Sequence, residues 1–230
     1  MALTRSDVVD AAIGILDEYG LGDLTMRRLA ASLGVQPGAL YWHVANKQAL
    51  LGAVADRILE HLDDDMPTGD WDLRFNELAH RLRAALLAHR DGAEVVAAAH
   101  SLRTGQGGTL ALLSQVLADA GFTPAEAELA ALAVLHYVLG HTADEQGHAQ
   151  SETLARTAGT PAAGVTASAA DLATPGTATP GTATPGTATP GTAEGAAGGP
   201  QTSDSPLAGE TARFGFGLSV FVDGLRARLT

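Results

Sequence analysis

Residues 24–47 read LTMRRLAASLGVQPGALYWHVANK and hold two short helical patterns separated by a glycine. Thr25 is a good N-cap for the first pattern, because its hydroxyl can accept a free backbone N–H of the first turn. Gly34 follows the last apolar residue, where helices commonly end in a left-handed residue. Pro37 then occupies a first-turn position, where its missing N–H costs nothing. This layout predicts a helix-turn-helix, whose second helix enters the major groove of DNA.

The charges of this segment agree with a DNA-binding role. The basic residues between positions 25 and 53 are Arg27, Arg28 and Lys47, and no acidic residue occurs there. The whole chain has a formal net charge of −12, so the segment is a local exception in an acidic protein. Because phosphate binding needs local positive charge, this placement favours DNA as the partner. The alternative is that Tyr41 and Trp42 are core aromatics of an ordinary helical domain.

Composition excludes several other classes of protein. The chain has 230 residues and no cysteine, which excludes a disulfide framework and thiolate chemistry. Four acidic residues interrupt the first 20 positions, so no signal peptide is expected. No run approaches the ~20 apolar residues of a membrane span, so we expect a cytoplasmic protein without a membrane partner.

Helical periodicity continues through most of the chain. The first helix should open at Ser6 and end at Gly20, with its apolar face formed by Val8, Val9, Ala12, Ile13 and Leu16. Asn46 can cap a long connecting helix, and further helices are expected at about residues 73–89, 93–102, 109–120, 123–150 and 211–229. No segment alternates as a strand does, so the chain should be all-α. The expected division is a three-helix DNA-binding domain at 1–46 and a larger helical domain at 47–230.

A low-complexity tract precedes the last helix. The unit Thr-Pro-Gly-Thr-Ala occurs four times between Thr174 and Ala193. It has no large apolar side chain, so it cannot bury enough surface to offset chain entropy. Residues 157–206 are therefore predicted to form a flexible, disordered loop.

The chain resembles the tetracycline repressor (TetR) family of bacterial one-component regulators. The residues that carry this resemblance at the DNA-binding end are Thr25, Arg27, Leu29, Ala30, Leu33, Gly34, Val35, Leu40, Tyr41, His43, Lys47 and Leu50. Residues 85–95, 121–123, 145–148 and 216–225 resemble the family's regulatory core. The resemblance spans nearly the whole chain apart from roughly residues 155–207.

The resemblance implies that a homodimer binds double-stranded operator DNA. The residues expected at the DNA are Thr25, Arg27, Gln36, Pro37, Gly38, Ala39, Tyr41, Trp42, His43 and Lys47. The family's base-reading positions match Pro37, Gly38 and Ala39, which have no side-chain hydrogen-bonding groups. Gln36 is the nearby amide that could pair with adenine or bridge through water. Direct readout of bases should therefore be limited, and the operator should differ from that of the tetracycline system.

The resemblance also implies a pocket for a small-molecule effector. The family's drug-contacting positions match Asp63, Leu78, Leu82, Val96 and Ala99, so a magnesium–tetracycline chelate has lost its ligands here. The effector should be a largely apolar or aromatic molecule with a few polar groups. Its expected contacts are Leu78, Leu82, Val96, Ala99, Leu113, His136 and Asp144, and no cofactor or bound metal is expected.

One polar cluster allows more than one interpretation. His141, Asp144, Glu145 and His148 share one face of a helix and could hold a divalent metal. They could instead form a solvated or dimer-facing polar stripe, or contact the effector.

The combined prediction is a ligand-responsive transcriptional regulator, a repressor released from its operator by an effector other than magnesium-tetracycline. Homodimerisation is expected through a four-helix bundle of the helices near 125–150 and 211–229, whose glycines permit close approach. No catalytic residues are assigned. The alternative is a helical enzyme or metal-binding protein with an appended DNA-binding domain.

Overall fold

The computed structural model describes residues 3–105, 107–158 and 206–229, and these contain helices and no strand. The elements are α1 (Arg5–Tyr19), the short 3-10 helix η1 (Leu21–Asp23), α2 (Met26–Ser32), α3 (Pro37–Leu40), α4 (Lys47–Ile58), α5 (Trp71–Leu87), α6 (Gly92–Ser101), α7 (Gly108–Asp119), α8 (Pro124–Ala158) and α9 (Pro206–Arg226). The prediction of an all-α chain is confirmed.

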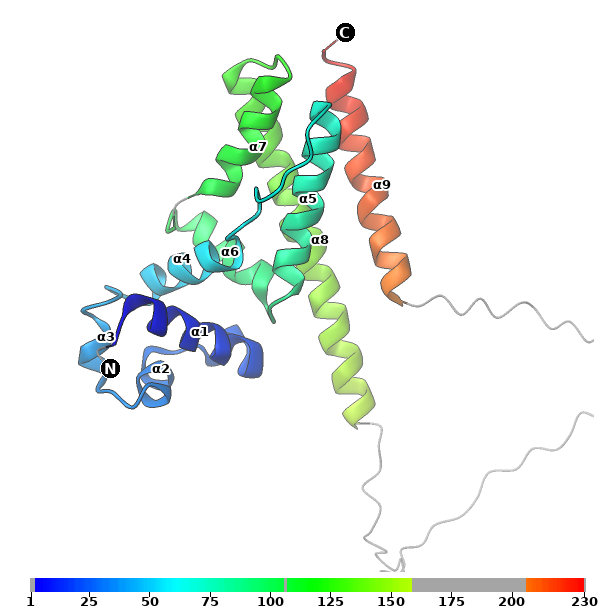
Figure 1. The fold of residues 1–230 in the computed structure, drawn as a ribbon. Helices are drawn as coiled ribbons and strands as arrows, with labels where there is room; N and C mark the ends of the chain where they lie inside the picture. The colour runs from blue at the N-terminus through cyan, green and yellow to red at the C-terminus, as the bar shows by residue number, and fades with distance from the viewer. Residues whose placement is uncertain (1–2, 106, 159–205, 230) are drawn as a thin grey trace, which may run out of the picture.

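The N-terminal lobe consists of α1, α2 and α3 (Figure 1). Its first helix starts one residue before the predicted Ser6, because Thr4 and Asp7 form a reciprocal capping box. The Thr4 hydroxyl accepts the Asp7 N–H at 3.2 Å, and the Asp7 carboxylate accepts the Thr4 N–H at 2.8 Å. Ile15 rather than the predicted Ile13 completes the fully buried face of α1.

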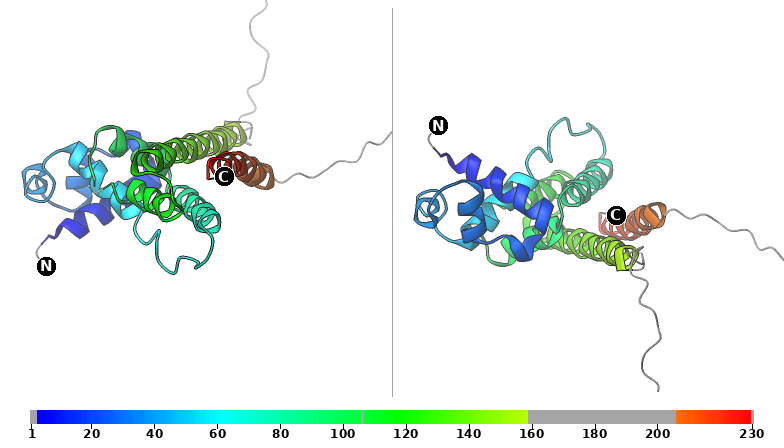
Figure 2. Two further views of the ribbon diagram at one scale, coloured as in Figure 1. Left: turned by 90° about the horizontal axis from the view of Figure 1, so that it is seen from above. Right: turned by 90° about the horizontal axis from the view of Figure 1, so that it is seen from below.

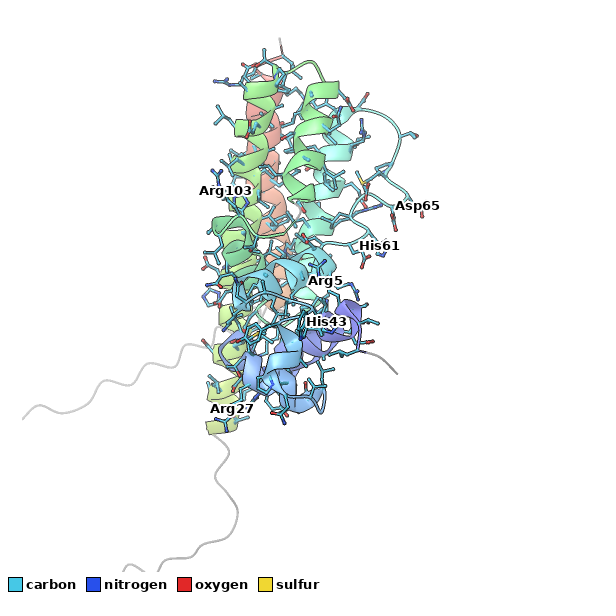
Figure 3. All side chains as sticks on the ribbon, turned by 90° about the vertical axis from the view of Figure 1, so that its left-hand side faces the viewer. Arg5, Arg27, His43, His61, Asp65 and Arg103 are labelled. Carbon is cyan, nitrogen blue, oxygen red and sulfur yellow. The ribbon has the colours of Figure 1, made fainter. Side chains whose placement is uncertain are left out.

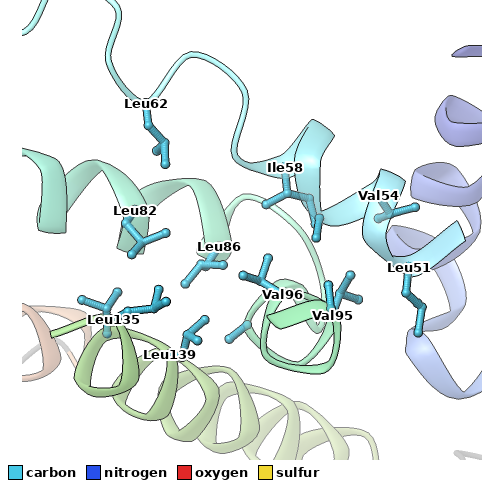
Figure 4. Packing of buried hydrophobic residues seen from close by; sticks show 14 of the residues in the cluster. Leu51, Val54, Ile58, Leu62, Leu82, Leu86, Val95, Val96, Leu135 and Leu139 are labelled. Carbon is cyan, nitrogen blue, oxygen red and sulfur yellow. The ribbon is translucent and has the colours of Figure 1, made fainter. Parts of the chain in front are cut away.

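Helix α4 connects this lobe to the rest of the molecule. Asn46 caps it as predicted, because its side-chain oxygen accepts the Ala49 N–H at 2.8 Å. One face of α4 packs against α1 and another packs against α6. Figure 4 shows Leu51, Val54 and Ile58 of α4 next to Val95 and Val96 of α6. A single hydrophobic core therefore runs from the N-terminal lobe into the larger helical body.

The larger body is built on α5, α7, α8 and α9, which run alongside one another (Figure 1). Helix α8 packs against α5, α6 and α7, and α9 lies along α5 and α8, as both views of Figure 2 show. Leu78, Leu82 and Leu86 of α5 are buried in the centre of this body.

Two predicted helix boundaries were wrong at the low-complexity tract. Helix α8 continues to Ala158 instead of ending near Gln150, because residues 151–158 include Glu, Leu, Ala and Arg and no Gly or Pro. Helix α9 begins at Pro206, where a first-position proline is favourable. The ends of the predicted loop, 157–158 and 206, are thus helical. Its remaining residues, 159–205, lie outside the described part of the chain.

Candidate DNA interface and effector cavity

The predicted helix-turn-helix is present, and its caps have the expected geometry. The Thr25 hydroxyl accepts the Arg28 N–H at 3.1 Å and so caps α2. Gly34 has φ of 66°, the left-handed conformation that disfavours a side chain. Pro37 is the first residue of α3, a helix of 4 residues. Leu40 anchors α3 because it is fully buried, and the turn that follows carries Tyr41, Trp42 and His43.

Tyr41 and Trp42 lie on the surface beside α3. Trp42 is 90% exposed and Tyr41 is 54% exposed. The alternative that these aromatics belong to a hydrophobic core is therefore wrong. The other residues expected at the DNA divide by exposure: Thr25, Arg27, Gln36, Pro37, Gly38 and Lys47 are exposed, while Ala39 and His43 are half-buried. Figure 3 shows Arg27 and His43 on the N-terminal lobe that carries this surface.

The positive charge available to phosphates is smaller than the sequence suggests. Arg28 is less available to bind phosphates, because it forms an ion pair with Asp23 at 3.1 Å and its guanidinium lies 4.2 Å from the centre of the Tyr19 ring. Arg27 and Lys47 are the exposed cations that remain in the segment 25–53. Residues 1–47 as a whole contain four basic and five acidic side chains. Phosphate attraction at this lobe therefore depends on local placement rather than on net charge.

A cavity of about 890 Å³ lies where α4, α6 and α7 meet the start of α1. We call it the junction cavity. Its apolar wall includes Val96, Ala99, Leu112 and Leu135, and its polar groups include His100, Thr104, Thr109 and Gln115. Arg5, Asp56, Arg57, Glu60 and Asp63 add charged groups to its lining. The cavity is thus suited to a ligand with an apolar body and several polar contacts.

The residues expected to contact an effector are not all brought together by the fold. Val96 and Ala99 line the junction cavity. Leu78, Leu82 and Leu113 are at most 1% exposed and lie in the packed core. His136 and Asp144 are exposed on α8 and do not line the junction cavity. Sequence reasoning missed the contributions of α1, of Thr104 and of residues 107–112, because only tertiary placement brings them to the cavity.

His100 gives the junction cavity a titratable group. Burial, with smaller contributions from His136 and Arg103, lowers the pKa of His100 below its ordinary value. The His100 and His136 rings lie 5.7 Å apart between their centres. Because its pKa is lowered, His100 is neutral at neutral pH, so its ring offers one hydrogen-bond donor and one acceptor to a bound ligand.

Helix α4 contacts the rim of this cavity very closely. A Cβ atom added at Gly52 would lie 2.6 Å from the Gly105 backbone nitrogen and 2.9 Å from the Thr104 carbonyl carbon. Gly105 has φ of 91°, and a Cβ added there would lie 2.8 Å from a carboxylate oxygen of Asp56. The α6–α7 connection, which contributes Thr104 to the cavity, thus rests directly on the helix that leads to the DNA-binding lobe.

The four residues of the polar cluster on α8, His141, Asp144, Glu145 and His148, lie in different environments. Glu145 is buried and forms a bidentate ion pair with Arg83 of α5, at 2.6 and 3.0 Å. His141 points toward Glu210 of α9, at 3.8 Å, whereas Asp144 and His148 are exposed. Among the described residues, no three His, Asp or Glu side chains converge as a metal site would require. The interpretation as a solvated stripe is wrong for Glu145, which is buried and connects α8 to α5, whereas Asp144 and His148 are exposed as that interpretation expects.

Helices α8 and α9 share an exposed apolar surface. Leu129 on α8 and Phe216 and Val220 on α9 are well exposed. A groove of about 320 Å³ between the two helices is lined by Ala130, Ala133, Val220, Phe221, Gly224, Leu225 and Arg228. A Cβ at Gly140, Gly215 or Gly224 would meet nothing within 4 Å, whereas Gly217 already abuts Tyr137. Large apolar side chains in such a continuous patch are typical of an interaction surface.

Within the described residues, none of the helices combines the length and the apolar composition that a bilayer-spanning segment requires.

Comparison with known families covers both parts of the chain. The family described as "Bacterial regulatory proteins, tetR family" matches residues 8–54. The family described as "Tetracyclin repressor-like, C-terminal domain" matches residues 64–182. Among curated relatives, the tetracycline repressor protein class D of Escherichia coli is 37% identical over 154 residues, which cover 66% of this chain and 70% of that protein.

Solved structures resemble the chain over most of its length. The crystal structure of Mycobacterium smegmatis BioQ has a TM-score of 0.71 and 36% identity, and covers 98% of this chain and 99% of its own. BioQ with its double-stranded DNA operator has a TM-score of 0.62 and 45% identity over 68% of this chain and 94% of its own. A TetR variant from Acinetobacter baumannii AYE in complex with minocycline has a TM-score of 0.65 and 29% identity, covering 100% of this chain and 99% of its own.

Proposed function

This chain belongs to the TetR family of bacterial regulatory proteins, and we propose that it works in the cytoplasm as a homodimeric, ligand-responsive repressor. In this proposal α3 of each protomer enters the major groove of a pseudo-palindromic operator. A small effector bound in the junction cavity then releases the DNA. The observation that carries the proposal is the exposed surface of α3 and residues 41–47, on a lobe joined by α4 to a cavity of about 890 Å³.

Recognition of the operator should depend little on base-specific hydrogen bonds. Pro37, Gly38 and Ala39 occupy the start of α3 and have no side-chain donors or acceptors, while Gln36 is exposed just before them. The neighbouring Tyr41 and Trp42 can contact sugars and phosphates, which positions the helix on the duplex. We infer that specificity comes from Gln36, from apolar contact with thymine methyl groups and from DNA shape.

The apolar surface of α8 and α9 is the proposed dimer interface. A second copy placed there would cover Leu129, Phe216 and Val220 and complete a four-helix bundle. A twofold axis through this bundle would present two α3 helices to one side of a DNA duplex, as a palindromic operator requires. Phe216→Glu should therefore give a monomer by light scattering, whereas the wild-type protein should have the mass of a dimer.

The effector should be an amphipathic small molecule. The cavity volume of about 890 Å³ falls within the roughly 300–1,000 Å³ range of small-molecule pockets. Val96, Ala99, Leu112 and Leu135 fit an aromatic or aliphatic body, and the polar lining fits a few hydrogen-bonding groups. Magnesium–tetracycline should act poorly, because leucine and valine stand at the matching positions Leu78 and Val96. A release of ~100-fold needs about 2.7 kcal/mol of preference for the released state.

The alternative of an enzyme or metal-binding protein receives less support. The relatives with related sequences are regulators, and one related structure contains operator DNA. The polar cluster on α8 that motivated a metal site is divided between the Arg83 ion pair and exposed positions. We therefore assign residues 47–230 to effector binding and dimerisation, and residues 1–46 to DNA binding.

Selection of bound duplexes from a random DNA pool tests this function. We expect one enriched site with two half-sites related by twofold symmetry. Lys47→Ala should weaken binding to every duplex and reduce the slope of log affinity against log salt by about one unit. Enrichment of no sequence, or a site without internal symmetry, would contradict the proposal.

A further inference from the structure

The junction cavity is shared by both domains. Arg5, Ser6 and Val9 of α1 line it together with Arg57 of α4 and Glu60 just after α4. Its opposite wall belongs to the larger body, through α6, α7 and the Leu135 turn of α8. A ligand in this cavity therefore touches the DNA-binding lobe itself, and not only the helices that lead to it.

The part of α1 that reaches the cavity packs against α4 through apolar side chains, and one polar side chain of α4 adds hydrogen bonds to it. Arg57 donates hydrogen bonds to the Ser6 hydroxyl, at 2.9 Å, and to the Asp10 carboxylate. Its Nε also pairs with Glu60 at 3.1 Å. We call these four residues the Arg57 clasp. Ser6, Arg57 and Glu60 line the cavity, so a bound molecule that displaces the guanidinium would undo the clasp.

The other end of α1 is held separately. Asp17 accepts the Arg90 N–H at 3.2 Å and lies 3.1 Å from His89 Nδ1. Just beyond α1, the Leu21 N–H donates to Asp91 at 2.8 Å. These contacts attach the C-terminal end of α1 to the α5–α6 turn, away from the cavity. Loss of the clasp would leave these polar contacts at the C-terminal end of α1, while its N-terminal end would be held to α4 by apolar packing alone. Apolar packing is not directional, so this end of α1 could then shift along α4, and α2 and α3 would move with it.

We propose that α1 senses the effector directly. Binding in the junction cavity breaks the hydrogen bonds of Arg57 to Ser6 and Asp10, and the DNA-binding lobe then rotates about the contacts between the end of α1 and the α5–α6 turn. This inference rests on the effector cavity of the proposed function and adds the element that senses the ligand. The Arg57 and Asp10 side chains are partly exposed, so breaking their ion pair costs little free energy. The binding free energy of a small ligand can therefore exceed this cost.

The test places an aromatic group in the cavity covalently, and the absence of cysteine in the chain makes the labelling specific. A Leu112→Cys variant, in the cavity wall, is labelled with benzyl methanethiosulfonate. A Leu73→Cys variant with the same label is the control, because Leu73 is exposed on α5 and does not line the cavity. Hydrogen–deuterium exchange then reports the protection of the amides of residues 8–12 in α1.

Labelled Leu112→Cys should exchange these amides about fivefold faster than its unlabelled form, the size expected when partly exposed ion-pair contacts are lost. Labelled Leu73→Cys should show no change. Adding Arg57→Gln should raise exchange before labelling and remove the effect of the label, because the two changes act on the same contacts. Adding Arg74→Gln, which removes the α5–α7 pair with Asp119, should leave the effect of the label intact.

Unchanged α1 exchange on labelling, with or without a response at residues 104–108, would overturn the inference. Operator affinity measured on the same samples separates this failure from that of the proposed function. If the label releases DNA while α1 exchange stays constant, only direct reading by α1 is refuted. If the label affects neither exchange nor operator affinity, the ligand response of the proposed function fails as well.

Discussion

Replacing Gly52 by alanine should disturb the contact between α4 and the α6–α7 connection. The new Cβ would lie 2.6 Å from the Gly105 backbone nitrogen and 2.9 Å from the Thr104 carbonyl carbon, which real Cβ atoms do not tolerate. Both neighbours are backbone atoms, so relief requires a shift of the loop or the helix. Such overpacking costs typically about 1–3 kcal/mol. It opposes the gain of about 1 kcal/mol that alanine brings to a helix interior.

Gly14→Ala provides the matched control. Gly14 lies in α1, and a Cβ there would meet nothing within 4 Å. This variant should gain about 0.5–1 kcal/mol of unfolding free energy from helix propensity alone. The two substitutions are chemically identical, so the difference of about 1–3 kcal/mol between them isolates the clash.

Urea unfolding at one fixed protein concentration measures this difference, since dimerisation makes apparent stability depend on concentration. With an m-value of about 2 kcal/mol/M, the midpoint of Gly52→Ala should lie about 0.5–1.5 M below that of Gly14→Ala. Equal stabilisation by the two alanines would refute the close packing of α4 on the α6–α7 connection.

Trp42→Ala should weaken operator binding at least tenfold with little loss of stability, because its side chain is exposed; fluorescence anisotropy and thermal unfolding measure the two effects. Glu145→Leu should lower the free energy of unfolding by about 3–5 kcal/mol, because it leaves Arg83 buried without its partner; adding Arg83→Met should restore most of this free energy, and urea unfolding measures both effects. The pKa of His100 is lowered in the folded protein, so the unfolded chain binds more protons below about pH 6.5. The free energy of unfolding should therefore decrease as the pH falls below about 6.5. His100→Asn should make this decrease smaller, as measured by melting temperatures over a series of pH values.

Local signals in the sequence were sufficient to predict where the helices of the DNA-binding lobe begin and how they are capped. Thr25 and Asn46 cap their helices and Pro37 opens α3, because each effect depends on residues a few positions apart. The capping box of Thr4 and Asp7 has the same local character. Its Thr-x-x-Asp spacing before an apolar run was available in the sequence and would have placed the start of α1 correctly.

The effector cavity could not be located in the same way. Helical periodicity identifies apolar faces, but it does not separate side chains that fill the core, such as Leu78 and Leu113, from those that line a void, such as Val96. Arg83 and Glu145 are 62 positions apart, so their pairing depends on how α5 and α8 pack. The contribution of α1 to the cavity has the same origin, because it follows from the angle at which α4 joins the two domains.

The most direct measurement is the affinity of the purified protein for its selected operator and for a scrambled duplex of equal length and composition, at one physiological salt concentration. A repressor that reads its operator through α3 should bind the selected site at least about 10³-fold more tightly than the scrambled one. Trp42→Ala should reduce that affinity while leaving the fold intact. Equal affinity for the two duplexes, or binding that the α3 surface does not affect, would contradict the assignment of this chain as a sequence-specific regulator.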